Sequence, residues 1–137
     1  MTEHHNIIIV GAGLSGLYLA WRLQQDNHDV IVLESRNRTG GRILSADYND
    51  TCRFDIGPAW LWPHLQPRLQ QLITRLDLKI FRQFTSGELL YEKSPSDIER
   101  YSQQSSHSQS YRIAGGSQSL IDALQLSIAD SAIHLDT

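Results

Sequence analysis

The chain has little cysteine and no long apolar run, and each shortage excludes a class of protein. Cys52 is the only cysteine among 137 residues, so no intrachain disulfide can form, which is typical of a reducing compartment. The apolar run at residues 7–10 is too short for a membrane span or for the apolar part of a secretory signal. We therefore expect a cytoplasmic protein that has no membrane partner.

The chain also lacks a large excess of charge of either sign. Twelve basic residues stand against 15 acidic ones, which gives a formal net charge of -3. A surface that binds nucleic acid normally carries a basic excess, so we expect no nucleic-acid partner. Hydrophobic residues make up 40% of the chain and charged residues 20%, which is a globular composition. The length suits one domain of ordinary size.

Two short β-branched runs enclose a helical pattern at the start of the chain. Residues 7–10 and 30–33 are each predicted to form a buried parallel strand that is apolar on both faces. Between them, residues 14–25 carry apolar side chains at mostly helical spacing. A strand, a helix and a second strand within this length make a crossover unit, which we expect to be right-handed.

The turn after the first strand carries the pattern G-x-G-x-x-G at Gly11, Gly13 and Gly16. The first glycine permits a tight turn, the second lets a pyrophosphate approach the backbone, and the third lets the helix pack on the strand. Free N–H groups at the helix start attract the phosphates. Glu34 ends the second strand, 18 residues after Gly16, where an acid binds a ribose hydroxyl and disfavours a 2′-phosphate. This context favours a dinucleotide site over an ordinary glycine-rich turn.

Weaker patterns predict the remaining elements. Residues 43–54 are expected to hold short strands, and residues 65–76 an amphipathic helix. Residues 79–84 and 88–91 flank Thr85-Ser86-Gly87 and are expected to form a hairpin. The polar segment 94–110 is predicted to be a surface loop. A helix over 118–128 and a third sheet strand near 132–135 complete the pattern.

A loop of arginines and glycines, residues 36–42, follows Glu34 directly. Such a loop can approach an anion closely, and the guanidinium fork suits a phosphate. Taken in isolation, the segment is more typical of a solvated basic loop. A simple NAD-binding domain has no use for it.

Three segments resemble the flavin-containing amine oxidase family, which includes monoamine, polyamine and L-amino-acid oxidases. Residues 34–42 resemble its E-x-x-x-R-x-G-G-R segment, and residues 55–60 its D-x-G-x-x-W turn beside the flavin ring. Residues 112–117 with Leu120 are similar to its G-G-x-x-x-L segment. The resemblance covers essentially the whole chain in the right order, and the N-terminal pair of motifs is its specific part. It implies FAD as the cofactor.

The resemblance also implies which residues would contact FAD. The residues that would lie against the pyrophosphate are Gly11, Gly13, Leu14, Ser15 and Gly16. The ribose would be held by Glu34 with Ser35 and Arg36 alongside, and the phosphate region would be contacted by Gly41 and Arg42. The flavin ring would be lined by Gly57, Pro58, Ala59 and Trp60.

No catalytic residue is assigned, and no metal is expected. Members of the family run to several hundred residues, and their second flavin-binding segment, their water-bridging lysine and most of their substrate domain lie nearer the C-terminus. Lys79 and Lys93, the only lysines of this chain, match no such motif. No cluster of metal-ligand residue types stands out in the sequence.

The expected fold is α/β, with a Rossmann-like FAD-binding βαβ unit, a parallel sheet and a small helical and hairpin insertion. We expect the FAD-binding unit and the Arg/Gly loop in residues 1–60, the insertion in residues 61–111, and a return to the FAD-binding domain in residues 112–137. We expect that domain to be incomplete. A sheet without its later strands would expose an apolar edge through which copies of the chain could self-associate.

The expected function is that of an FAD-binding oxidoreductase of the amine oxidase type, with a small-molecule amine as the substrate of a complete protein. Three alternatives remain open: a relative that acts on a porphyrinogen or a carotenoid, a truncated non-catalytic dinucleotide-binding module, and a plain NAD-binding domain.

Overall fold

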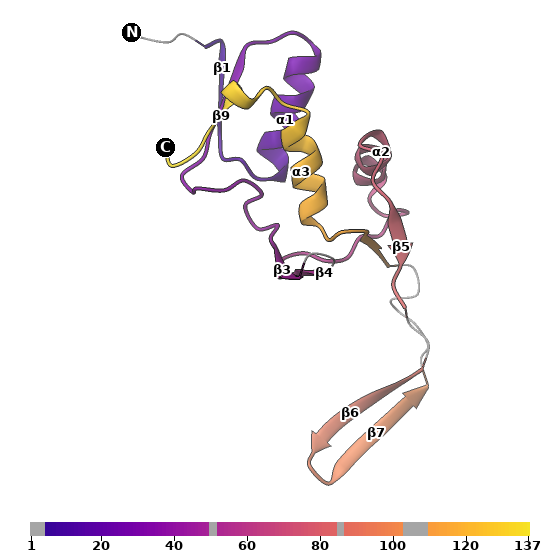
Figure 1. Ribbon diagram of the computed structural model, residues 1–137. Helices are drawn as coiled ribbons and strands as arrows, with labels where there is room; N and C mark the ends of the chain where they lie inside the picture. Colours follow the sequence, from indigo (N-terminus) through magenta and orange to yellow (C-terminus); the bar gives the residue numbers. More distant parts are fainter. Residues whose placement is uncertain (1–4, 50–51, 85–86, 103–109) are drawn as a thin grey trace.

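The computed structural model describes residues 5–49, 52–84, 87–102 and 110–137, which form an α/β fold (Figure 1). The helices are α1 (Leu14–Gln25), α2 (Pro67–Arg75) and α3 (Gln118–Leu126), with a 3-10 turn at Asp130–Ala132. The strands are β1 (Ile7–Val10), β2 (Val30–Leu33), β3 (Ser45–Asn49), β4 (Cys52–Asp55), β5 (Ile80–Arg82), β6 (Glu88–Ser94), β7 (Asp97–Ser102), β8 (Tyr111–Ile113) and β9 (Ile133–His134).

A parallel sheet of the order β1-β2-β9 forms the centre of the fold. β1 pairs with β2 along its whole length, from Ile7 opposite Val30 to Val10 opposite Leu33. β9 pairs with the other edge of β2 through Ile133 and His134. The predicted βαβ unit and the predicted third strand are therefore confirmed.

The core lies between this sheet and the helices α1 and α3, and it also includes Leu72 and Ile73 of α2. α1 and α3 lie side by side next to the sheet (Figure 1). Leu17 of α1, Val32 of β2, and Ile121 and Leu124 of α3 are completely buried, and they belong to one hydrophobic cluster. Burial of these apolar side chains is the main driving force for docking α3 on the βαβ unit.

The expectation that the first strand is buried on both faces is wrong. Within β1, Ile9 is buried, whereas Ile8 is 58% exposed and Val10 is 88% exposed. β1 is an edge strand, and the helices pack on the side of the sheet that Ile9 faces. The central strand β2 does match the expectation, because Val30, Ile31 and Val32 are all buried.

The predicted hairpin of residues 79–84 with 88–91 is also wrong. β5 pairs instead with β8, which places Ile80 opposite Ile113. β6 pairs with β7, which lies inside the segment that we expected to be a loop. Lys93 pairs with Glu99 and Arg100 pairs with Glu88 across this hairpin. Figure 1 shows that this hairpin projects away from the sheet.

Two parts of those predictions lie outside the described residues, namely the turn at 85–86 and the loop at 103–109. Within the described residues, none of the helices has both the length and the apolar character needed to cross a membrane.

Candidate functional site

The glycine turn joins β1 to the start of α1. Gly11 has φ of +99°, a conformation that favours glycine, and its amide donates to the Leu33 carbonyl at 2.7 Å. Gly13 is the residue before α1 and accepts the first helical hydrogen bond, from Leu17, at 3.0 Å. Among the described residues, no side chain caps this helix start, and no acidic residue lies in its first turn. The N–H groups there remain available to an anion.

The glycines of the motif differ in the space around them. A Cβ added at Gly16 would lie 2.0 Å from the Gly11 carbonyl oxygen, so the packing of α1 on the turn requires glycine at 16. A Cβ added at Gly11 or Gly13 would meet no atom of the described chain within 4 Å. Gly13 has an ordinary φ of -75°, so neither its backbone nor its neighbours require glycine. The open space over Gly13 fits a group that must approach the backbone closely, as a pyrophosphate does.

The carboxylate of Glu34 is held against this turn. Its Oε2 accepts a hydrogen bond from the Ala12 amide at 2.8 Å, across 22 residues of sequence. Its Oε1 accepts from the Arg36 amide at 3.1 Å. Glu34 is buried, with 7% of its surface exposed. These contacts fix the orientation of the acid at the end of β2.

The same contacts perturb its ionisation. The amides of Ala12 and Arg36, in that order, lower the pKa of Glu34, and they outweigh the opposing effect of burial. The charge on Arg36 and the hydroxyl of Ser35 lower it further. Glu34 is therefore a preoriented anion that can accept hydrogen bonds from hydroxyl groups, as recognition of a ribose requires.

The Arg/Gly loop packs directly beside the glycine turn. The Gly40 amide donates to the Ala12 carbonyl at 2.8 Å, and Gly40 forms a parallel bridge with Gly13. A Cβ at Gly41 would lie 3.3 Å from the Cα of Gly13, and Gly41 has φ of +61°. The two glycine segments that the sequence suggested are thus brought together at one place.

The arginines of this loop have different surroundings. Arg38 turns inward and donates to the carbonyls of Thr39 at 3.0 Å and Gly41 at 2.9 Å, so it braces the loop. Arg36 makes a longer contact with the Gly41 carbonyl, at 3.4 Å. Arg42 is exposed and makes no hydrogen bond or ion pair within the described ranges. Arg42 is the guanidinium of the loop that is available to an anion.

The segment after β4 packs on the same loop. A Cβ at Gly57 would lie 2.2 Å from the Arg42 carbonyl oxygen, so glycine is required there for close packing. Pro58 is exposed, Ala59 is half-buried, and Trp60 is 48% exposed. The structure places this segment next to Arg42. Contact of Gly57, Pro58, Ala59 and Trp60 with a flavin stays a prediction, as do the roles of Leu14 and Ser15.

The sequence did not reveal that Asp55 connects two parts of the fold. Its Oδ1 accepts hydrogen bonds from Ser45 Oγ at 2.7 Å, from the Ser117 amide at 2.7 Å and from Ser117 Oγ at 2.8 Å. It therefore ties β3 and β4 to the start of α3. The signal available in the sequence was a lone acid before a glycine and a serine before a helix, which does not reveal that the two meet.

Comparison with known proteins agrees with this geometry. A family profile described as an NAD(P)-binding Rossmann-like domain matches residues 9–76. A probable polyamine oxidase of Arabidopsis thaliana is 38% identical over 97 residues, which is 70% of this chain and 19% of that protein. A 1-hydroxycarotenoid 3,4-desaturase of a Flavobacterium is 30% identical over 102 residues, covering 69% of this chain and 21% of that protein.

Solved structures share the fold. A putrescine oxidase determined with putrescine bound superposes with a TM-score of 0.83 at 20% identity, covering 99% of this chain and 51% of that one. The chain thus spans about a fifth of the length of the polyamine oxidase and about half of the putrescine oxidase structure. By its sequence relatives and its Rossmann-like fold, it belongs to the flavin amine oxidase family and corresponds to the N-terminal dinucleotide-binding region of longer homologues.

Proposed function

We propose that this chain binds FAD, and that it does so as the N-terminal region of an oxidoreductase of the amine oxidase type. The observation that carries the proposal is the open space over Gly13, where no part of the described chain requires a glycine. That space lies between a helix start with free N–H groups and the Arg/Gly loop. Both features suit the pyrophosphate of a dinucleotide.

Each part of the site has a separate role in this proposal. The turn and the start of α1 bind the pyrophosphate through backbone N–H groups. Glu34 accepts hydrogen bonds from the hydroxyls of the adenosine ribose. Arg42 adds a charge-assisted contact to the phosphate region, and Gly57 lets its segment pack close to that arginine.

FAD, when bound, would supply the hydride acceptor for oxidation of a C–H bond next to an amine nitrogen. The residues of this chain bind and orient the cofactor, and none of them is assigned a proton transfer. An amine is the substrate class favoured by the polyamine and putrescine oxidases among the relatives. A carotenoid or porphyrinogen substrate is the alternative, since the desaturase shares the same region.

The direct test is to titrate the purified chain with FAD, NAD and NADP by calorimetry, and to record the flavin absorbance that remains after desalting. We expect saturable FAD binding and much weaker binding of either nicotinamide dinucleotide. Tighter binding of NAD than of FAD would favour a plain NAD-binding domain and contradict the proposal. Failure to bind FAD, NAD or NADP would also contradict the proposal and would favour a module that binds no dinucleotide.

A Gly13→Ala variant tests the placement of the ligand. The added Cβ meets nothing in the described chain, so the thermal unfolding midpoint should change little. FAD affinity should nevertheless fall by about tenfold or more, equivalent to ~1.4 kcal/mol, because the methyl group occupies the place of the pyrophosphate. Ser131→Thr, which adds a methyl group to an exposed residue of the 3-10 turn, is the matched control and should bind normally.

A further inference from the structure

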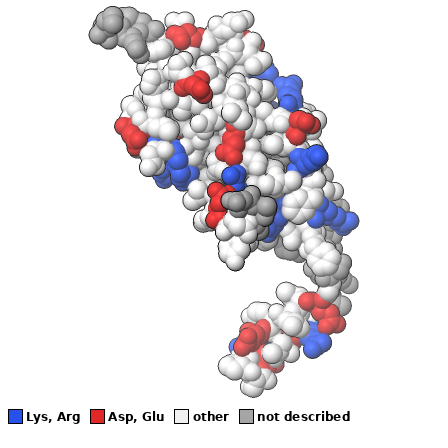
Figure 2. Space-filling model, in the orientation of Figure 1, with Lys and Arg blue, Asp and Glu red and all other residues white. Residues whose placement is uncertain are grey.

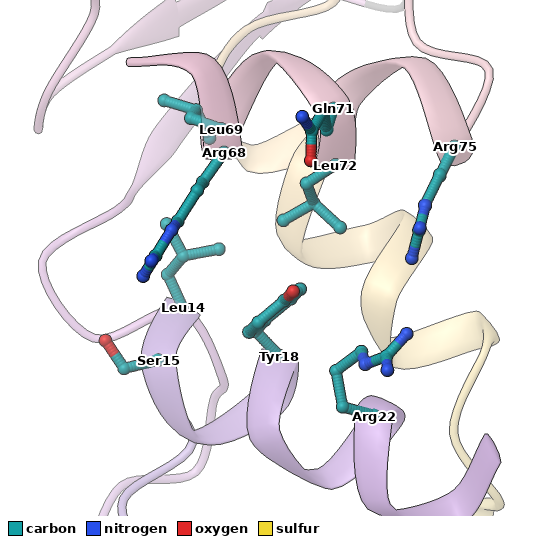
Figure 3. Close-up of a pocket in the computed structure, with 9 residues that line it drawn as sticks. All are labelled: Leu14, Ser15, Tyr18, Arg22, Arg68, Leu69, Gln71, Leu72 and Arg75. Carbon is teal, nitrogen blue, oxygen red and sulfur yellow. The ribbon is translucent and has the colours of Figure 1, made fainter. Parts of the chain in front are cut away.

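A pocket lies between α1 and α2, along the side of α1 (Figure 3). Its volume is about 510 Å³, within the range of small-molecule sites. It touches the glycine turn only through Leu14 and Ser15. Nine residues line it: Leu14, Ser15, Tyr18, Arg22, Arg68, Leu69, Gln71, Leu72 and Arg75. The FAD proposal leaves most of this pocket without a role.

The lining is basic and contains no acid. Arg22 comes from α1, and Arg68 and Arg75 come from α2. Within the described parts of the chain, none of these three arginines forms an ion pair, whereas Arg53 contacts Asp47 at 2.8 Å and Asp122 at 3.1 Å. Figure 2 shows several Lys and Arg side chains along the side of the molecule that carries α2. This local excess stands out in a chain whose formal net charge is -3.

The arginines occupy the two ends of the pocket. In Figure 3 the guanidinium groups of Arg22 and Arg75 point toward one another from opposite helices, and Arg68 extends toward Leu14 and Ser15. Arg68 and Arg75 are seven residues apart on one helix, which corresponds to about 10 Å along its axis. Two like charges that face each other repel, and an anion placed between them replaces that repulsion with two charge-assisted contacts.

The middle of the pocket is apolar. Leu14, Leu69 and Leu72 contribute aliphatic side chains, and Tyr18 contributes a ring. The ring of Tyr18 lies 5.9 Å from that of Trp21, in a tilted arrangement that supports its position. A purely inorganic anion would leave this apolar surface in contact with water. A ligand with an apolar body would cover it.

We propose that this pocket binds a small organic anion, with its phosphate or carboxylate group held between Arg22 and Arg75 and its apolar body lying on Tyr18 and Leu72. Leu14 and Ser15 border both this pocket and the glycine turn, but Arg22 and Arg75 lie outside the residues proposed to contact FAD, and the proposal does not depend on FAD binding. Among the residues that the structure describes, neither Arg22 nor Arg75 forms an ion pair, so both guanidinium groups can contact a ligand.

The test is an NMR titration of the isotope-labelled full chain with phenyl phosphate and, separately, with benzoate. Saturable shifts should appear in the side-chain N–H signals of Arg22 and Arg75. The probe that binds more tightly shows whether the pocket prefers a phosphate or a carboxylate. Inorganic phosphate and benzyl alcohol, which each lack one half of the ligand, should bind more weakly than the better probe. The affinity of the better probe should fall as sodium chloride is added.

Variants locate the binding. The double variant Arg22→Gln with Arg75→Gln should weaken the better probe by about tenfold or more, whereas Arg100→Gln on the β6–β7 hairpin should change its affinity by less than about twofold. Unchanged affinity in the double variant, equal binding of benzyl alcohol, or shifts confined to residues 11–16 and 36–42 would each overturn the proposal. So would the absence of saturation below about 10 mM. If the double variant fails to fold, the wild-type shift map and salt dependence still decide the question.

Discussion

The carboxylate of Asp55 holds both the backbone amide and the hydroxyl of Ser117, at 2.7 and 2.8 Å, across 62 residues of sequence. The contact lies at the start of α3, where Ser45 Oγ also accepts a hydrogen bond from the Gln118 amide, at 3.2 Å. It joins the segment that follows the Arg/Gly loop to the helix that completes the core. Asp55 therefore acts as a cap supplied from a distant part of the chain.

We predict that Asp55→Ala destabilises the fold by about 1–3 kcal/mol, because the Ser117 amide and hydroxyl lose their shared acceptor. Urea unfolding followed by circular dichroism measures the change. The exposed acid Asp47, which pairs with Arg53, provides the control, and Asp47→Ala should cost less than about 1 kcal/mol. Equal effects of the two substitutions would show that Asp55 does not organise α3.

The lowered pKa of Glu34 predicts that the stability of the fold depends on pH. Its pKa in the folded chain lies below its ordinary value of 4.5. A depressed pKa means that the carboxylate stabilises the fold at pH values above 4.5, and that this contribution is lost as the pH falls through the folded pKa. The stability difference between wild type and Glu34→Gln should therefore be largest near neutral pH and should narrow on acidification.

Urea midpoints measured from pH 7 down to about pH 3 test this dependence. Glu92→Gln, on the exposed β6–β7 hairpin, is the control and should follow the wild-type curve. A gap between wild type and Glu34→Gln that widens below pH 4.5 would contradict the lowered pKa.

We predict that substitutions at Arg38 and Arg42 affect different properties, namely stability for Arg38 and FAD binding for Arg42. Arg38 donates to the Thr39 and Gly41 carbonyls, so Arg38→Ala should lower stability by about 1–2 kcal/mol. Arg42 makes no such contact within the described residues, so Arg42→Ala should leave stability unchanged and weaken FAD binding by a few kcal/mol at most. Thermal unfolding and FAD calorimetry on both variants check the pair. Unchanged FAD affinity in Arg42→Ala would count against its phosphate contact.

The two valines Val10 and Val32 test the exposed edge of the sheet. Val32 is fully buried, and a Val32→Thr hydroxyl without a partner should cost about 1–3 kcal/mol. Val10 is 88% exposed, so Val10→Thr should change stability by less than about 0.5 kcal/mol. A large cost at Val10 that depends on protein concentration would show that a second copy covers β1. Self-association through this edge stays a prediction.

Local patterns determined the βαβ unit from the sequence alone. β-branched runs at residues 7–10 and 30–33, an apolar helical spacing between them and a G-x-G-x-x-G turn all act over a few residues, so the bounds of β1, α1 and β2 were predicted correctly. The position of Glu34 beside the turn was predictable for the same reason, because its distance from the turn follows from the length of the unit.

Only the tertiary structure decided the contacts between segments that are far apart in the sequence. The pairing of β5 with β8, the capping of α3 by Asp55 and the inward turn of Arg38 each depend on which surfaces meet when the core closes. The exposure of Ile8 and Val10 likewise depends on which face of the sheet the helices cover. Periodicity reports which side of an element is apolar, and it carries no information about the partner that side will find.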